Sequence, residues 1–307
     1  MSLQFVADGL LIGAMIALGA IGVTLTYSIL RFANFTHGEF ITIGAYAALA
    51  ALGGFAGLVA DGLVADAGTF GELSFGWPLV VALLLAVLVT GGVALLLDWL
   101  LFRRLRRHGS AIVMVIASFG ASLALRNLIA FGFGPQPDYF TRALQMSIEL
   151  LPGLRVTPDQ LVVLGLTALL VAALHLFLSR TTLGRAMRAT AENPALATLV
   201  GIDVRAVVRW TWLIGGGLAA IAGIFLGLTV QVRPSMGFDL LLPLFAAAIL
   251  GGIGSPYGAV LGGLLIGLAE SLSVPLVGSE YRQAVGFLVM LAVLLWRPHG
   301  LLGERAS

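Results

Sequence analysis

The densest group of side chains that could do chemistry lies between the first two apolar runs of the chain. It comprises Asn34, Thr36, His37 and Glu39. Polar groups cannot lie unsatisfied in lipid, so we expect this group to face protein, water or a membrane interface. The pattern is typical of a short cytoplasmic turn in which Asn34 or Thr36 caps the next helix and Thr36 and Glu39 form a capping box. It is also typical of a broken helix that lines a pathway, and the two interpretations are compatible.

A second interruption, Gly251–Gly258, falls within a 30-residue stretch (240–269) that contains no Asp, Glu or Arg. A continuous helix of that length would span about 45 Å, which exceeds the roughly 30 Å core of a bilayer. Four glycines and a proline predict a break into two helices, about 239–252 and 257–272. The glycines favour tight helix packing through small-xxx-small spacing, or a discontinuous helix beside a transport path.

Other kinds of chemistry are excluded by the residues that are missing. All 17 basic residues are arginine, and the chain has neither lysine nor cysteine. A P-loop needs its lysine, and thiolate metal sites need cysteine. Because no Ser/His/Asp set and no metal-ligand spacing is found, we predict no catalytic residue, no metal and no cofactor. The net charge of +2 gives no indication of nucleic acid binding.

The elements that must position these groups are membrane helices. The chain is 59% hydrophobic and only 10% charged, with a mean hydropathy of +1.04. Stretches free of Asp, Glu and Arg run over 9–30, 40–60, 73–97, 109–125, 160–179, 210–232, 240–269 and 283–296. We predict an all-α, polytopic membrane helical bundle with eight to nine transmembrane segments, including broken helices. It forms a single domain over 1–307, and 132–159 is expected to be an outer loop.

Arginine placement predicts the orientation. With nine crossings, 12 of the 17 arginines fall on one face, 4 fall on the other, and Arg126 lies within a span. The N-terminus is then periplasmic and the C-terminus cytoplasmic. Arg126 is interpreted either as snorkelling or as a paired or path-lining charge. For Asp98 we favour a local ion pair, and for His175 an interfacial position. The tryptophans are expected to form an aromatic belt at the span ends: Trp77, Trp99, Trp210, Trp212 and Trp296.

The long basic link 180–209 contains helix signals of its own. Asn193-Pro194 is a good helix start and Gly201 a good stop, which predicts a short helix over 194–200. A basic helix is expected just upstream, around 183–189. The link is interpreted as an interfacial helix on anionic lipid or as a docking helix for a soluble cytoplasmic partner.

Taken in order, these segments resemble the permease subunits of branched-chain amino acid ABC importers, specifically the LivH type of the LivH/LivM pair. The resemblance covers nearly the whole chain. The matching strings are 34–40 with 44–46, 184–194 with 201–204, 250–259, Arg297-Pro298 and Gly300-Leu301. The string Asn-Phe-Thr-His-Gly-Glu favours the LivH type. A glycine-rich outer insertion, 53–72, departs from the pattern and is expected to vary among relatives.

The resemblance implies a non-catalytic subunit that works by alternating access. The partners implied are a second, LivM-like permease beside it among the lipids of the bacterial inner membrane, two ATPase subunits on the cytoplasmic face and a periplasmic binding protein. Residues expected at the substrate path or its gate are Asn34, Thr36, His37, Glu39, Gly252, Gly254 and Ser255. Residues expected to couple to the ATPase are Gly184, Arg185, Arg188, Glu192, Asn193, Pro194, Leu196, Gly201 and Asp203.

An alternative is a stand-alone ion-coupled secondary transporter or channel. Such a protein would need buried carboxylates at mid-span. In the sequence the acids cluster at the ends of the predicted spans, which counts against it. Whether the solute is a branched-chain amino acid or a related small polar compound is left open, because selectivity is expected to lie largely in the binding protein.

Overall fold

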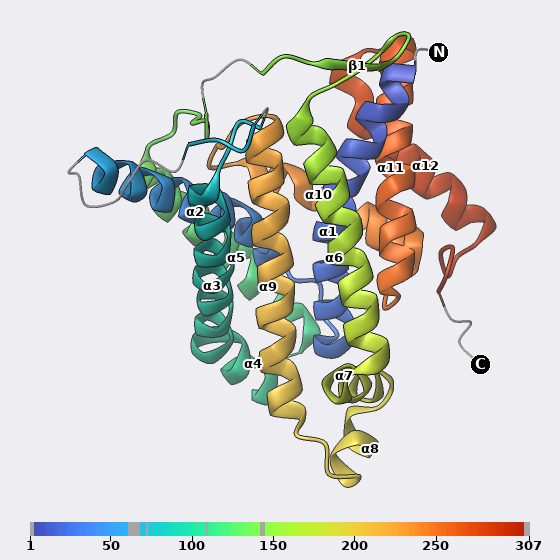
Figure 1. Cartoon of the computed structure of the whole chain (residues 1–307). Helices are drawn as coiled ribbons and strands as arrows, with labels where there is room; N and C mark the ends of the chain where they lie inside the picture. Colours follow the sequence, from blue (N-terminus) through green and yellow to red (C-terminus); the bar gives the residue numbers. More distant parts are fainter. Residues whose placement is uncertain (1–2, 61–67, 72, 109, 142–144, 304–307) are drawn as a thin grey trace.

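The computed structural model describes residues 3–60, 68–71, 73–108, 110–141 and 145–303. It is a bundle of long helices (Figure 1). The helices are α1 (Leu3–Leu30), α2 (Thr36–Ala60), α3 (Trp77–Leu97), α4 (Arg103–His108), α5 (Ala111–Phe133), α6 (Pro158–Arg180), α7 (Thr182–Glu192), α8 (Pro194–Leu199), α9 (Val204–Thr229), α10 (Met236–Gly251), α11 (Pro256–Val277) and α12 (Arg282–Trp296). A π-helix, Asp98–Phe102, joins α3 to α4, and a 3-10 turn, Ser279–Tyr281, precedes α12.

Seven of the described helices are long and apolar enough to cross a membrane, the third being α3 continued through the π-helix into α4. The apolar helix α10 is shorter, with 16 residues, and α12 has 15. The predicted break is confirmed, because the helix that ends at Gly251 is separate from the helix that begins at Pro256. Part of the outer insertion 53–72 continues α2 to Ala60, whereas 61–67 and 72 lie outside the described residues.

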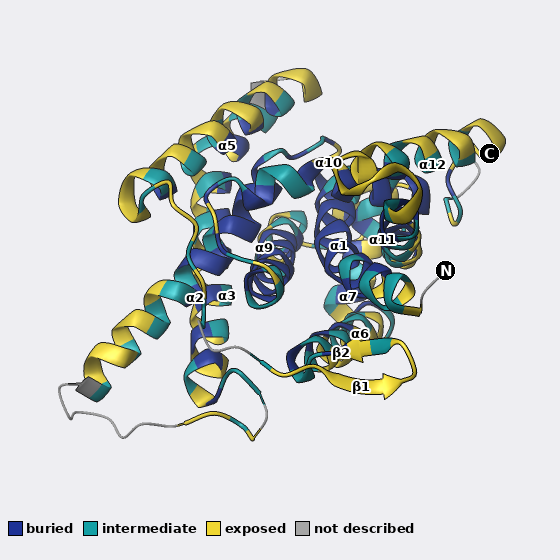
Figure 2. Ribbon diagram, turned by 90° about the horizontal axis from the view of Figure 1, so that it is seen from above, coloured by how far each residue is buried: buried dark blue, intermediate teal, exposed yellow. Residues whose placement is uncertain are grey.

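The helices α1 and α9 form the centre of the bundle. Figure 2 shows both as mostly buried, with α5 and α12 at the periphery and largely exposed. A helix that is apolar on all sides is stable only when lipid or protein surrounds it. The described chain has two ends: the basic end, which carries α4, α7 and α8, and the hairpin end, which carries the start of α1 and strands β1 (Ile148–Leu151) and β2 (Leu154–Val156) (Figure 1).

The hairpin corrects the prediction of a plain outer loop over 132–159. β1 and β2 are antiparallel, with Ile148 opposite Val156 and Leu151 opposite Leu154. Gly153, at a φ of +82°, makes the turn between them. Residues in the left-handed region are usually glycine, so Pro152-Gly153 is a turn signal that the loop prediction passed over.

Small residues bring the helix axes close, as the spacing predicts. A Cβ built on Gly263 or Gly267 of α11 would lie 2.7 or 2.3 Å from the backbone of α1. A Cβ on Gly258 or Gly262 would lie 2.1 Å from the backbone of α10. The two glycine pairs therefore fit α11 between two neighbours, and the packing interpretation of this region is confirmed.

Four of the five tryptophans expected in an aromatic belt are exposed, and one is buried. Trp77, Trp99, Trp210 and Trp296 are exposed near helix ends. Trp212 is fully buried, stacks on Phe102 with ring centroids 5.2 Å apart, and donates a hydrogen bond from Nε1 to Asp98. Two residues along a helix turn the side chain by about 200°, so Trp210 and Trp212 point to opposite faces of α9.

Candidate functional site

The segment between α1 and α2 turns back into the bundle. Arg31 adopts a φ of 59° directly after the end of α1, and Phe32 and Asn34 are buried. The Nε2–H of His37 donates to the carbonyl oxygen of Gly19 at 3.0 Å. Gly19 lies 11 residues before Leu30, or about 16 Å along the axis of α1. The helix α2 therefore begins near the middle of the bundle and not at its surface, as a broken helix would.

The first turn of α2 is capped as predicted, but the predicted capping box is wrong. The Oδ1 atom of Asn34 accepts hydrogen bonds from the backbone N–H of Thr36 at 3.1 Å and from its hydroxyl at 2.5 Å. The carboxylate of Glu39 is directed to α5 instead of to the cap. Asn34 therefore supplies the side-chain cap at Thr36, which leaves Glu39 available for an interaction across helices.

The buried Glu39 forms an ion pair with the partly exposed Arg126 of α5. Its Oε1 accepts from the Ser122 hydroxyl at 3.1 Å and lies 3.4 Å from Nε and Nη2 of Arg126. The guanidinium carbon lies 3.8 Å from the ring centroid of Phe238, which belongs to α10. Arg126 is thus paired, and the snorkelling interpretation is wrong. The sequence placed Glu39 at the end of a span, whereas the structure places it deep in the bundle with no exposed surface.

We call Asn34, Thr36, His37, Glu39, Ser122 and Arg126 the polar corner. Three buried atoms in it form no hydrogen bond within the described part of the chain: Nδ2 of Asn34, Nδ1 of His37 and Oε2 of Glu39. Most buried polar atoms in proteins are hydrogen-bonded, so three exceptions in one place mark this region as unusual. Neither Ser122 nor Phe238 stands out in the sequence, because a serine and a phenylalanine in apolar helices give no distinguishing signal.

A cavity of about 320 Å³ borders the polar corner on the side of the hairpin end. It is lined by Arg126 and Asn127 of α5 and by Gln231, Arg233 and Ser235 of the link between α9 and α10. Arg233 also pairs with Asp239 at 3.0 Å. Arg126 therefore connects this cavity to the buried carboxylate of Glu39.

The three predicted gate residues of the glycine break lie in a different environment. Gly252 and Gly254 have φ values of +104° and +100°, and Ser255 caps α11 by accepting from the N–H of Gly258 at 3.1 Å. The C-terminal segment packs here: the N–H groups of Leu301 and Leu302 donate to the carbonyls of Leu250 and Gly251 at 2.9 Å. Among the described residues, no hydrogen bond joins the break to the polar corner.

The link 180–209 folds as the local signals predict. Asn193 caps α8 by accepting from the N–H of Leu196 at 3.0 Å, with Pro194 at the first helical position. Asp203 caps α9 through Oδ1, which accepts from the N–H groups of Arg205 and Ala206. Gly201, at a φ of +87°, makes the turn between α8 and α9.

The link also divides into a buried face and an exposed tip. In α7, Gly184 is pressed against α6, where a Cβ would lie 2.4 Å from the carbonyl oxygen of Phe177. Arg185, Arg188 and Glu192 of the same helix are exposed. The tip, formed by α8 and the residue after it, exposes three apolar side chains: Leu196, Leu199 and Val200. Gly184 therefore has a packing role. The exposed side chains of α7 and of the tip are suited to contact with another protein.

The sequence matches a known protein family over residues 5–294, described as branched-chain amino acid transport system / permease component. The chain belongs to this family. It is accordingly a membrane component of an ABC transport system and carries none of the ATPase chemistry.

The most similar curated relatives include permeases of the same kind. The chain is 34% identical to the high-affinity branched-chain amino acid transport system permease protein BraD of Pseudomonas aeruginosa, covering 98% of this chain and 96% of the relative. It is also 34% identical to LivH of Escherichia coli K12, with the same coverage. The match to the LivM permease protein of that strain is 31% identical but covers 49% of this chain and 36% of LivM. The LivH-like assignment is therefore confirmed.

In this permease Arg31 joins the segment that leads into the polar corner to the link. The guanidinium of Arg31 donates a hydrogen bond to the carbonyl oxygen of Ala191, in the last turn of α7. Arg31 is also the first residue of the segment that enters the polar corner. Movement of α7 would thus act directly on the start of α2.

Replacing Arg31 with glycine removes the hydrogen bond to Ala191 but keeps the backbone conformation of residue 31. Glycine adopts a φ of 59° readily, whereas other residues pay roughly 1–2 kcal/mol there. We expect Arg31→Gly to keep the melting temperature of the purified protein within a few degrees while ATP-driven uptake falls several-fold. Normal uptake by Arg31→Gly would show that the hydrogen bond to Ala191 transmits nothing.

Proposed function

We propose that this permease forms the path of an ATP-driven importer for branched-chain amino acids, and that the substrate passes the polar corner. The observation that carries the proposal is the Glu39–Arg126 pair, which lies between the 320 Å³ cavity on the side of the hairpin end and the buried start of α2. An amino acid presents an ammonium and a carboxylate, and each can replace one member of that pair. Substrate could therefore be stabilised transiently without leaving either charge unpaired.

The proposed topology has nine crossings. It adds the short helices α10 and α12 to the seven longer spans, in the manner of the discontinuous helices common in transporters. Because arginines concentrate at the basic end, that end is proposed to be cytoplasmic. The N-terminus and the hairpin would then be periplasmic in a bacterial inner membrane, and the C-terminus cytoplasmic.

The proposed partners follow from the two ends. Two ATPase subunits would bind at the basic end, one of them on the exposed tip of α8, and a periplasmic binding protein would deliver substrate at the hairpin end. A second, LivM-like permease would complete the path. Movement of the ATPases would displace α7 and α8, and the spans would rock to expose the polar corner to each side in turn.

The tip of α8 provides a test of coupling. Leu199 is 83% exposed, so Leu199→Asp should change stability by less than about 0.5 kcal/mol. We expect it to reduce binding of the ATPase subunit, measured by co-purification, by at least tenfold, because a charge would be buried in an apolar contact. Leu276→Asp, at an exposed leucine of the opposite end, is the matched control and should bind the ATPase normally. Equal binding by both variants would place the ATPase elsewhere.

The stand-alone alternative needs a separate experiment, because Glu39 is a buried carboxylate of the kind an ion-coupled transporter uses. Uptake of branched-chain amino acids is measured in proteoliposomes with and without the ATPase subunits, ATP and the binding protein. We expect uptake only with the complete set. Uptake driven by an ion gradient through the permease alone would overturn the ATP-driven assignment.

A further inference from the structure

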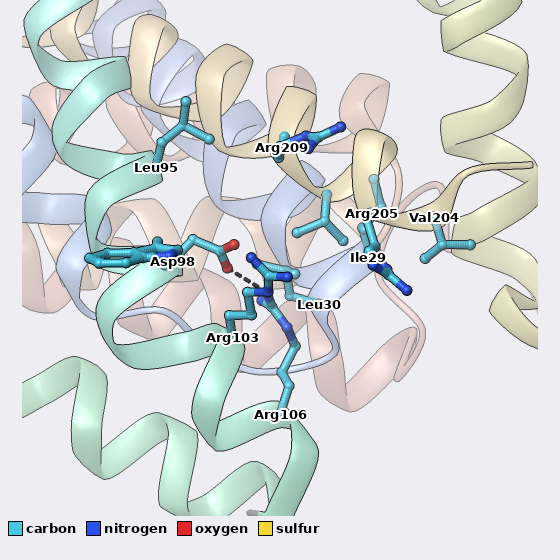
Figure 3. A pocket seen from close by; sticks show the side chains of 11 residues that line it. Ile29, Leu30, Leu95, Asp98, Arg103, Arg106, Val204, Arg205 and Arg209 are labelled. Atoms are coloured by element: carbon cyan, nitrogen blue, oxygen red, sulfur yellow. Dashed lines mark hydrogen bonds and ion pairs between the residues drawn. The ribbon is translucent and has the colours of Figure 1, made fainter.

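A second cavity, of about 710 Å³, opens at the basic end between α1, the α3–α4 region and the start of α9. Four arginines line it, two from α4 and two from α9: Arg103, Arg106, Arg205 and Arg209. Figure 3 shows Asp98 paired with Arg106 inside the cavity and Arg205 and Arg209 on the α9 side. This cavity is separate from the polar corner and from the exposed tip of α8.

The charges lining this cavity are unbalanced. Asp98 is its single acid, and its Oδ1 already accepts from Arg106 at 2.5 Å and from Trp212 at 2.8 Å. Arg103, Arg205 and Arg209 form no ion pair within the described residues, and Nη1 of Arg106 is buried without a hydrogen-bond partner. Three uncompensated positive charges beside a buried donor favour an anion in the same space.

The rest of the lining is apolar. Ile29, Leu95 and Val208 form part of the wall, and Trp99 is 56% exposed at the rim. Trp99 belongs to the π-helix in the last third of the third span, and exposed tryptophans near span ends mark the headgroup level of a bilayer. The cavity thus combines a cationic side with an apolar side at the depth where the phosphates of lipids lie.

We propose that this cavity binds an anionic phospholipid of the adjoining leaflet. The phosphate would lie among Arg103, Arg205 and Arg209, and an acyl chain would follow Leu95 and Trp99. Basic pockets between transmembrane helices are suited to such headgroups, whereas a soluble anion would gain nothing from the apolar wall. Because Arg205 and Arg209 belong to the first turns of α9, the lipid would hold the base of the link that carries α8.

The test measures lipid binding to the purified importer complex by native mass spectrometry, with phosphatidylglycerol, phosphatidylcholine and glycerol 3-phosphate as separate probes. Arg205→Gln/Arg209→Gln removes two cavity charges. Arg104→Gln/Arg180→Gln removes two exposed arginines from the same end that do not line the cavity. At about 1 kcal/mol per arginine, we expect phosphatidylglycerol affinity to fall roughly 30-fold in the first variant and less than threefold in the second.

Three outcomes would overturn the proposal: equal losses in the two variants, equal binding of phosphatidylcholine and phosphatidylglycerol, or binding of glycerol 3-phosphate as tight as that of the lipid. The last would make the cavity a site for a soluble anion.

A second measurement does not depend on the arginine variants. Brominated phosphatidylglycerol should quench tryptophan fluorescence, and Trp99→Phe should remove most of that quenching. Unchanged quenching in Trp99→Phe would contradict the proposed acyl-chain position.

Discussion

Glu39→Gln is expected to abolish most substrate uptake and to lower the stability of the permease by about 3 kcal/mol, because it leaves the Arg126 guanidinium unpaired in the bundle. The loss lies at the lower end of the usual range for a broken buried pair, because the side chain of Arg126 is 22% exposed and keeps some contact with water. Arg126→Gln should have a similar effect by leaving the fully buried carboxylate of Glu39 without its cation. Stability is measured by thermal unfolding in detergent and uptake in proteoliposomes with the ATPase and binding protein present.

The double variant distinguishes folding from transport. Glu39→Gln/Arg126→Gln leaves no unpaired charge, so it should be more stable than either single variant, whereas uptake should stay low. Glu270→Gln is the matched control, because Glu270 is another buried carboxylate within a span and lies outside the polar corner. We expect the control to keep near-normal uptake per folded molecule. If the two single variants lose stability but transport normally per folded molecule, the pair has a structural role only.

Gly267→Val is expected to have the largest effect on assembly. The Cβ of the new residue would lie 2.3 Å from the backbone nitrogen of Gly13, so α11 and α1 would have to separate. Because backbone cannot move aside as a flexible side chain can, the overpacking should exceed the usual 1–3 kcal/mol. We expect little folded protein, measured as the monodisperse fraction after extraction in mild detergent.

Gly120→Val controls for the intrinsic effect of the substitution. Gly120 lies within α5, and a Cβ there meets nothing within 4 Å. The helix propensities of the two replacements are the same, so any difference between the variants measures packing. Comparable amounts of folded Gly267→Val and Gly120→Val would contradict the close approach of α11 to α1.

Local signals were enough to predict the second break, the cap of α8 and the turn within the link. The break after Gly251, the cap at Asn193 and the turn at Gly201 each depend on a few neighbouring residues, and each is confirmed. Small-residue spacing also predicted that α11 packs closely on its neighbours. Such features follow from backbone geometry that adjacent residues determine.

Pairing across the bundle could not be predicted in the same way. The partner of Arg126 lies 87 residues away in the sequence, and no periodicity connects the two positions. The depth of Glu39 was misjudged for a related reason. A polar residue between two apolar runs is assigned to a surface turn, and the return of the chain along α1 becomes visible only in three dimensions. Trp212 was misplaced because distance from a span end does not reveal which face of the helix a residue occupies.

The buried start of α2 has a consequence for the order in which the protein is made. Glu39 reaches its partner only after α5 is synthesised. Thr42 of the same helix accepts a hydrogen bond at 3.1 Å from the N–H of Gly237, which lies 195 residues after Thr42 in the sequence. Chains emerge from the ribosome N-terminus first, so the first two helices enter the bilayer with a carboxylate that lacks its final partners. Until the later helices are made, we expect this part of α2 to stay near the aqueous interface or inside a protein channel. The polar corner is therefore among the last parts of the N-terminal half to reach its final position.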